Sequence, residues 1–505
     1  MDLERILSGL LCIFLLFPSM GNSQSPHLLT IEDALQMMSE NNPALQRKRE
    51  EVKQRSYEIK SRRGLRYPTV SLNAQAVSMS DPLHLDLTPV RDAITPLYNT
   101  LGNFGVFNGV PNPDPTTNQQ VPTLPDAQST AAVRQQLLAA EEEIKSAEWD
   151  KMIQEKNFAT VSAGFVWPIY AGGKISGANQ AANVNRDISK EELRQTEGIL
   201  LTELVSRYYG LVLGQEIVKL RQKMVENIDH HYHDATKLFK NGMIAKVELL
   251  HAKVAKNEAE RELKEAERNI EIIRSGLAAT LAEDSLQRVT PVSRLFINKN
   301  IEDIARWIET AKSSNPQLKQ IQGKMELVDI KHQIEKNAYL PTVAAMGNYH
   351  LADKNLSYYT PDWLVGVGLK WTLFEGMTRK NNIRASATIH HQVEYAEQKA
   401  KKDLTAYLTK LYHELQMQME QKTELETTLE LASEYSASTE KAFREGLATS
   451  TSVVEAHTKV MQVKVKRIKV MYDYDVALAQ FFQSTGTPEE FLNYSYGDNT
   501  IFESL

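Results

Sequence analysis

WPIYAGGKISG, residues 167–177, joins a short apolar segment to a long stretch without proline that ends at Gly242. The same arrangement starts again at Trp371. Seven residues of the first copy have counterparts 204 positions later: Trp167, Tyr170, Gly172, Tyr208, Phe239, Gly242 and Ala252 correspond to Trp371, Phe374, Gly376, Tyr412, Phe443, Gly446 and Ala456. A repeat on this scale predicts one supersecondary unit used twice.

Upstream of these segments the repeat continues with a different spacing. Asn42-Pro43 and Tyr67-Pro68 recur as Asn315-Pro316 and Leu340-Pro341, 273 residues later. The two spacings differ by 69 residues, so the first copy carries an insertion. We therefore divide the chain into a first repeat at 24–283 with an extracellular insertion at 81–156, an equatorial linker at 284–315, a second repeat at 316–486 and a C-terminal tail at 487–505.

The N-terminus has the features of a secretory signal peptide. An apolar run from Ile6 to Met20 follows Arg5, and we expect cleavage to remove residues 1–23. A membrane anchor is the alternative interpretation. The only cysteine, Cys12, lies inside this segment, which predicts a mature chain without disulfide or thiol chemistry. Later segments contain no run of about 18 apolar residues, the length that a transmembrane helix requires.

The repeat predicts helices and strands in a fixed order. The first helix starts after Thr30, with Asp33 completing a capping box, and reaches about Gly64. Strands with alternating polarity follow at about 69–78, 159–169, 342–351 and 363–373. Long helices at Lys174–Lys240 and Thr378–Arg444 turn at glycines into shorter helices at 245–282 and 450–483, and a further helix covers 316–338.

The insertion has a different composition from the repeats. Residues 81–126 are rich in Pro, Asn, Asp and Gly and predict a loop, whereas 128–153 predict a helix. An irregular surface loop without activity of its own is one interpretation, and a contact with substrate or phage is the other. After Pro488 the chain predicts a polar tail.

These elements predict a membrane pore that several chains build together. Strands of about ten residues cross a bilayer when they are tilted, and tryptophans near their ends suit its interfaces. Four strands cannot close a barrel, and unpaired strand edges cannot face lipid. Each long helix would extend for about 100 Å. The fold class is therefore a mixed α/β membrane protein, with a long antiparallel α-helical barrel continuous with a transmembrane β-barrel.

The chain resembles the TolC-like outer-membrane efflux family. The resemblance rests on the doubled Asn-Pro helix, the strand that ends in aromatic-x-x-Gly and the Phe-x-x-Gly turn, and it covers roughly Leu29 to Gly486 except the insertion. It implies a homotrimer whose outer-membrane barrel has twelve strands, four from each chain. It also implies a periplasmic helical barrel, an equatorial layer, and docking onto a periplasmic adaptor and an inner-membrane pump.

The resemblance assigns two sets of site residues. Adaptor-contacting tips correspond to Asn241, Gly242, Met243, Ile244, Ala245, Glu445, Gly446, Leu447, Ala448 and Thr449. The glycines also suit plain helix C-caps. Acidic residues of the closed periplasmic aperture correspond to Glu248, Ser452 and Glu455. The Tyr and Arg that tie the aperture in some members correspond to Phe443 and Ala448, so the resemblance implies no gate held by those polar ties.

Two groups of residues raise the question of ion binding. Rings of Glu248 and Glu455 would favour cations in the pore, although carboxylates on a solvated helix face are the alternative. In His230-His231-x-His233-Asp234, His230 shares a helix face with His233 or Asp234 at spacings that suit zinc or copper, but the second repeat lacks counterparts. The adjacent His390 and His391 are expected to point apart. We expect no metal site, cofactor or catalytic residue. The net charge of -6 gives no indication of a nucleic-acid partner, and we expect none.

The predicted function is an outer-membrane exit duct of a tripartite export system. It would conduct small toxic compounds such as drugs, metals or metabolites passively, because the sequence has no nucleotide-binding loop that could supply energy. The outer-membrane component of a type I protein secretion system is the nearest alternative. Two alternatives from a different class are a periplasmic adaptor and a structural trimeric helical protein.

Overall fold

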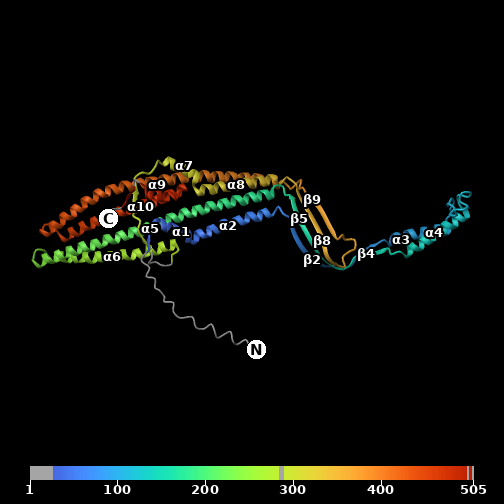
Figure 1. The fold of residues 1–505 in the computed structure, drawn as a ribbon, viewed down its shortest axis with the longest axis horizontal. Coiled ribbons are helices and arrows are strands. Elements are labelled where there is room, and N and C mark those ends of the chain that lie inside the picture. The colour runs from blue at the N-terminus through green and yellow to red at the C-terminus, as the bar shows by residue number, and fades with distance from the viewer. Residues whose placement is uncertain (1–26, 284–288, 498–499, 503–505) are drawn as a thin grey trace, which may run out of the picture. The chain divides into compact units, whose positions relative to one another are not determined.

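The computed structural model describes residues 27–283, 289–497 and 500–502. The expected signal peptide lies outside this part of the chain. The chain forms two compact units: a helical unit built from residues within 1–62, 176–336 and 377–505, and a sheet unit built from 63–175 and 337–376. Figure 1 traces the order of their elements along the chain. Each unit therefore draws on both repeats.

The four principal helices form two hairpins in the helical unit. The first hairpin consists of α5 (Lys174–Lys240) and α6 (Lys246–Leu281), and the second of α9 (Thr378–Arg444) and α10 (Ser450–Thr485). The predicted bounds of α5 and α9 are confirmed at both ends, because glycines mark where these helices start and stop. Buried apolar side chains recur along them at helical spacing, as packing along one seam requires.

Shorter helices precede each hairpin. Helix α1 (Ile31–Asn41) begins with the predicted capping box: the Thr30 side chain accepts a bond from the Asp33 N–H, and the Asp33 side chain pairs with the Thr30 N–H. Helix α2 (Pro43–Gly64) follows directly, and α8 (Pro316–Asn337) is its counterpart in the second repeat.

The repeated Asn-Pro pair has a structural explanation. The Asn42 side chain accepts a bond from Ala44 N–H at 2.9 Å and donates to the Thr280 carbonyl at 2.9 Å. Asn315 donates likewise to the Ser484 carbonyl at 2.7 Å, and both asparagines are buried. Each therefore caps the helix that follows and also satisfies a carbonyl near the end of a long hairpin, a role that buried backbone groups require.

Linker and terminal segments form small sheets beside the helices. Strand β1 (His27–Leu29) pairs in parallel with β6 (Val289–Pro291), and β7 (Phe296–Asn298) pairs antiparallel with β10 (Thr500–Phe502). Helices α7 (Ile304–Ser314) and α11 (Glu490–Ser495) complete this layer. The expectation of a polar tail after Pro488 is wrong, because Phe491 is 1% exposed and its ring packs on Phe296.

The sheet unit contains the four predicted long strands. Strands β2 (Thr69–Ser78), β5 (Asn157–Tyr170), β8 (Thr342–Lys354) and β9 (Trp363–Lys370) form one antiparallel sheet in the order β2-β5-β8-β9. Strand β9 ends at Lys370, three residues before the predicted end. The two repeats thus pair directly, through β5 and β8.

The base of the sheet keeps the repeat symmetry in its tryptophans. The Trp167 indole N–H donates to the Arg66 carbonyl at 3.0 Å, and the Trp371 indole N–H donates to the Tyr339 carbonyl at 2.9 Å. These are equivalent positions of the two repeats. An indole with an apolar body and one satisfied polar atom suits a boundary between apolar and aqueous surroundings.

Large apolar side chains cover the outside of the sheet within the single chain. Val70 is 73% exposed, Leu72 is 68% exposed and Val367 is 69% exposed. A soluble sheet would bury such a face against another layer. None of the described helices combines the length and the apolar character that a bilayer span demands.

The insertion is more ordered than its composition predicts. It contains β3 (Leu83–Asp86), α3 (Thr88–Phe104), α4 (Asp126–Ser146) and β4 (Asp150–Gln154). The loop prediction for 81–126 is wrong at β3 and α3, and the helix predicted at 128–153 ends at Ser146, before strand β4 begins at Asp150. Pro89 stands at the start of α3, where it costs no hydrogen bond, whereas Pro96 lies inside the helix. Glu141 of α4 accepts two bonds from Asn99 of α3 at 3.1 Å.

Candidate functional site: the paired helical tips

The two hairpin turns have the same backbone geometry. Gly242 has φ of 72° and Gly446 has φ of 75°, the left-handed region that suits glycine. The N–H of Gly242 bonds the Phe239 carbonyl and the N–H of Met243 bonds the Leu238 carbonyl, both at 2.9 Å. The second turn, at Gly446, has the same two hydrogen bonds. Each glycine therefore closes a Schellman cap, which confirms the simple structural role that the sequence offered.

Side chains from both hairpins meet behind the turns. Phe443 and Val453 of the second hairpin and Ala235 and Ala252 of the first form a buried apolar cluster. Phe443 is 2% exposed, whereas Phe239, its counterpart in the first repeat, is 37% exposed. The cluster is asymmetric because only one of the two phenylalanines points into the seam. Phe443 thus anchors one hairpin to the other instead of forming a polar tie.

Three polar contacts join the hairpins at the same level. The Glu248 carboxylate accepts a bond from the Ser450 N–H at 2.7 Å, His231 Nε2 lies 2.7 Å from Ser450 Oγ, and Arg444 pairs with Asp234 at 3.1 Å. The two turns are therefore held together within one chain. Sequence reasoning named Asp234 only as a possible metal ligand and missed its pairing with Arg444, because the repeat does not indicate which helices become neighbours.

His231 lies in an environment that keeps it neutral. Burial, followed by the neighbouring His457, lowers the pKa of His231 to about 4. Its ring packs on Phe443 with 4.7 Å between ring centroids. His457 pairs in turn with Glu440 at 2.6 Å. A neutral imidazole fits the contact with the Ser450 hydroxyl, because it can accept or donate at that nitrogen.

The tips present apolar side chains to solvent. Met243 is 57% exposed and Leu447 is 79% exposed, each at the position after the glycine. Of the predicted aperture residues, Glu455 is exposed, Ser452 is half-buried and bonded to Thr449, and Glu248 is half-buried and bonded to Ser450. Glu248 and Ser452 therefore stabilise the start of α10 as well as standing near the turns.

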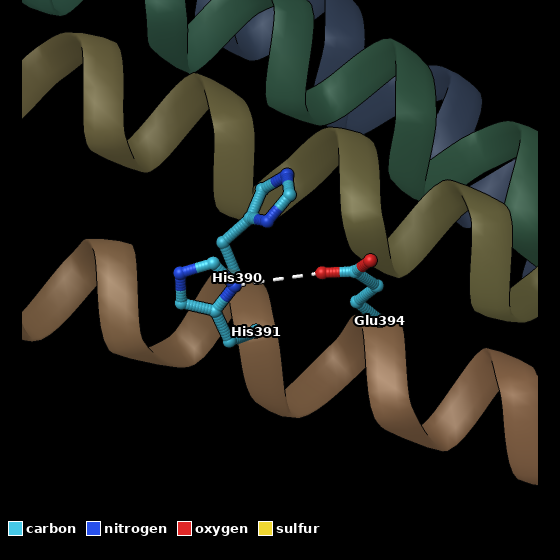
Figure 2. Close-up of side chains that lie close together, drawn as sticks. All are labelled: His390, His391 and Glu394. Atoms are coloured by element: carbon cyan, nitrogen blue, oxygen red, sulfur yellow. Dashed lines mark hydrogen bonds and ion pairs between the residues drawn. The ribbon is translucent and has the colours of Figure 1, made fainter.

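The histidine-rich segment near the first tip does not gather into an ion site. His231 is buried while His230 and His233 are exposed. Within the described residues, the one group of three or more potential ligands close enough to share an ion is His390, His391 and Glu394 on α9 (Figure 2). The sequence reasoning considered the histidine pair alone. Glu394 could have been found from its helical spacing to both histidines.

Comparison with known proteins agrees with this architecture. The family model for outer membrane efflux proteins matches residues 153–283 and 307–487. The cobalt-zinc-cadmium resistance protein CzcC of Cupriavidus metallidurans is 27% identical over 132 residues, which are 26% of this chain and 32% of CzcC. That match spans about a third of the curated relative.

Solved structures share the fold over most of its length. A crystal structure of CusC matches with a TM-score of 0.67 at 9% identity, and the match covers 90% of this chain and 92% of the CusC chain. VceC from Vibrio cholerae has a TM-score of 0.65 at 12% identity and covers 90% and 96%. The chain belongs to the outer membrane efflux protein family: it is a channel protein of the Gram-negative outer membrane and not an enzyme, and its helical part lies in the periplasm.

Proposed function

We propose that this chain is the exit duct of a tripartite export system and works as a homotrimer. The observation that carries the proposal is the open four-stranded sheet, whose edge strands β2 and β9 have no partner on their outer sides among the described residues. Lipid cannot satisfy those backbone groups. Three copies, each pairing β9 with the β2 of the next, form a closed barrel of about twelve strands.

An apolar stripe on α6 supports contacts between copies in the helical unit. Val247, Leu250 and Val254 are all more than half exposed and recur at intervals of three and four residues. That spacing is the seam of a two-helix contact. Because the stripe extends along α6 beyond the turn, we propose that a long helix of the neighbouring copy packs against it. The second repeat has Thr451 and Thr458 at two of the equivalent positions.

The exposed turns are the proposed docking points for a periplasmic adaptor, which connects the duct to an inner-membrane pump. Asn241 to Ala245 and Glu445 to Thr449 offer Met243 and Leu447 as apolar contacts on rigid, glycine-capped turns. Rigid apolar anchors lose little entropy on binding. Glu248, Ser452 and Glu455, repeated by threefold symmetry, form the proposed aperture.

Small toxic compounds are the proposed cargo. The similarity to CzcC, a cobalt-zinc-cadmium resistance protein by name, supports metal ions within that class. The pump supplies the energy and most of the selectivity, and the duct conducts passively. Secretion of unfolded polypeptide in a type I system remains the alternative cargo class.

The test starts from separated inner and outer membranes. Mass measurement of the detergent-extracted protein should give three chains per particle in the outer-membrane fraction. Cells that lack the gene should then accumulate a toxic compound that wild-type cells export. A replacement of Met243 and Leu447 by aspartate should abolish that export while the trimer persists. A monomer, or export that continues with both turns altered, would contradict the proposal.

A further inference from the structure

One turn of α9 brings two imidazoles and a carboxylate together. Successive residues of a helix are about 100° apart, so Glu394 lies about 40° from His390 and about 60° from His391 around the helix. Glu394 therefore stands one turn further on, between the two histidines. The expectation that His390 and His391 point apart overlooked this third residue, whose carboxylate a dashed line joins to the His391 ring in Figure 2.

The distances suit a single small ion. One ligand atom from each of the three side chains lies within 4.8 Å of the others. His391 Nδ1 is 3.4 Å from a Glu394 carboxylate oxygen. Ligands about 2.0–2.2 Å from a tetrahedral zinc ion are about 3.3–3.6 Å apart. One pair already has this separation, and small rotations of exposed side chains bring the third ligand to it.

Asp329 of the neighbouring helix α8 orients His390. The Nε2 atom of His390 lies 3.3 Å from Oδ1 of Asp329. A carboxylate at one imidazole nitrogen fixes the proton there and leaves the lone pair on the other nitrogen, the usual arrangement behind a metal-bound histidine. In Figure 2 the His390 ring points toward the neighbouring helix, and its second nitrogen lies on the side of Glu394.

The charge balance of this turn also indicates a cation. Among the described residues, no lysine or arginine forms an ion pair with Glu394. The equivalent turn of α5 holds Arg186, Asp187 and Lys190, where the aspartate pairs with both cations at 2.9 and 3.3 Å. The first repeat thus neutralises its own carboxylate with an arginine and a lysine, whereas the carboxylate of the second has two imidazoles as its neighbours.

We propose that His390, His391 and Glu394 bind one divalent transition-metal ion of the zinc class, with Asp329 as the positioning residue. Two imidazoles and one carboxylate are the donor set that such ions prefer, and a fourth position remains open to solvent. The side chains of His391 and Glu394 are 67% and 46% exposed in the single chain, so an ion in solvent reaches both ligands. The site does not depend on trimer formation or on the identity of the cargo.

Zinc binding to the full-length protein tests the site directly. The protein is extracted in detergent without a polyhistidine tag, stripped with a chelator, and titrated with Zn²⁺ by calorimetry. The wild type should bind one ion per chain, and the His390→Ala/His391→Ala variant should lose that ion. Co²⁺ should give a visible absorption band in the wild type that the double variant lacks.

Matched variants separate this site from other histidines. His230→Ala/His233→Ala removes the same number of imidazoles and should leave the zinc stoichiometry unchanged. Asp329→Asn should weaken zinc binding by about 10–100-fold, the usual effect of removing a carboxylate behind a ligand. Circular dichroism checks that each variant keeps its helices. Equal zinc binding by the wild type and the His390→Ala/His391→Ala variant would overturn the proposal, whether or not the duct exports its cargo.

Discussion

The carboxylate of Glu248 accepts a hydrogen bond of 2.7 Å from the backbone N–H of Ser450, although the two residues belong to different helical hairpins. Ser450 is the first residue of α10, where backbone N–H groups lack partners and the helix dipole favours negative charge. Thr449 caps the same end through Ser452 N–H, whereas Ala245 gives α6 no side-chain cap. The second turn therefore depends on the first.

We predict that Glu248→Ala loosens the second tip. The loss of one acceptor at a helix N-terminus costs about 0.5–2 kcal/mol of local stability. Hydrogen exchange should accelerate at the amides of residues 446–456. Glu455→Ala removes an exposed carboxylate from α10 itself and should leave these exchange rates unchanged. Equal protection in wild type and Glu248→Ala would show that the bond contributes nothing.

The two aperture glutamates should differ in their effect on conductance. Glu455 is exposed, whereas Glu248 is already bonded inside the chain, so Glu455 presents the more accessible charge. In planar bilayers, Glu455→Gln should lower the cation preference more than Glu248→Gln does, measured as the shift in reversal potential across a salt gradient. The reverse order would place the Glu248 side chain, and not Glu455, at the narrowest point.

Acid should weaken the packing of the tips through His231. Burial lowers the pKa of His231 to about 4, below the value of about 6.5 for an unfolded histidine. The unfolded chain therefore binds more protons between these values, and stability is lost as the pH falls from about 6.5 to 4. Asp234, His251 and His457 are the charged or titratable groups that influence His231.

Hydrogen exchange at the tips, followed from pH 7 to 4 and corrected for intrinsic rates, measures this effect. His231→Gln should remove the part of the acid sensitivity that comes from this ring, while His233→Gln, at an exposed position, should not. An acid response that is the same in both variants would assign the sensitivity to groups other than His231.

Asp475 should destabilise the helical unit at neutral pH. It is fully buried, and burial raises its pKa well above the ordinary value, while the backbone of Phe296 partly offsets this. An acid whose pKa is raised by folding loses stability as the pH rises above its unfolded pKa. Asp475→Asn should therefore stabilise the protein at pH 7, where the carboxyl of the unfolded chain is ionised.

Denaturant titrations at pH 4 and pH 7 would measure the difference. The gain from Asp475→Asn should be larger at pH 7 than at pH 4, where about half of the unfolded carboxyl groups are protonated. Asp473→Asn provides the control, because its side chain pairs with Lys469 on the surface at 2.7 Å. A gain that is independent of pH would point to packing instead of ionisation.

Met377 occupies a backbone conformation that glycine fills in the other repeat. It has φ of 68°, and its counterpart Gly173 has φ of 76°. A side chain in the left-handed region costs about 1–2 kcal/mol. Met377→Gly should therefore stabilise the protein by about 1 kcal/mol after the entropy of the added glycine is subtracted.

Thermal unfolding followed by circular dichroism gives the comparison. Gly173→Ala should lower the melting temperature, because a Cβ there would lie 2.6 Å from Asn337 Nδ2 in addition to the backbone strain. A lower melting temperature for Met377→Gly would mean that the 60% exposed methionine side chain makes contacts in the trimer.

Local signals explain why the order of the elements could be predicted. Alternating polarity indicates a strand, and a hydrophobic period of 3.6 residues indicates a helix that ends at a glycine with positive φ. Each of these signals occurs in both repeats. The bounds of α5 and α9 were therefore predictable to the residue. The insertion was less predictable, because the prolines and asparagines of α3 indicate a loop until α4 packs against it.

The doubled hairpin, the amphipathic strands and the glycine turns are predictable from the amino-acid sequence, because they depend on neighbours along the chain. Folding in three dimensions sets which hairpin atoms meet at the tips, buries Phe491 in the equatorial layer and brings Asp329 beside His390. Such contacts join residues that are distant in sequence. They depend on how the helices rotate about their axes and on their register, which periodicity constrains to a face but not to a partner.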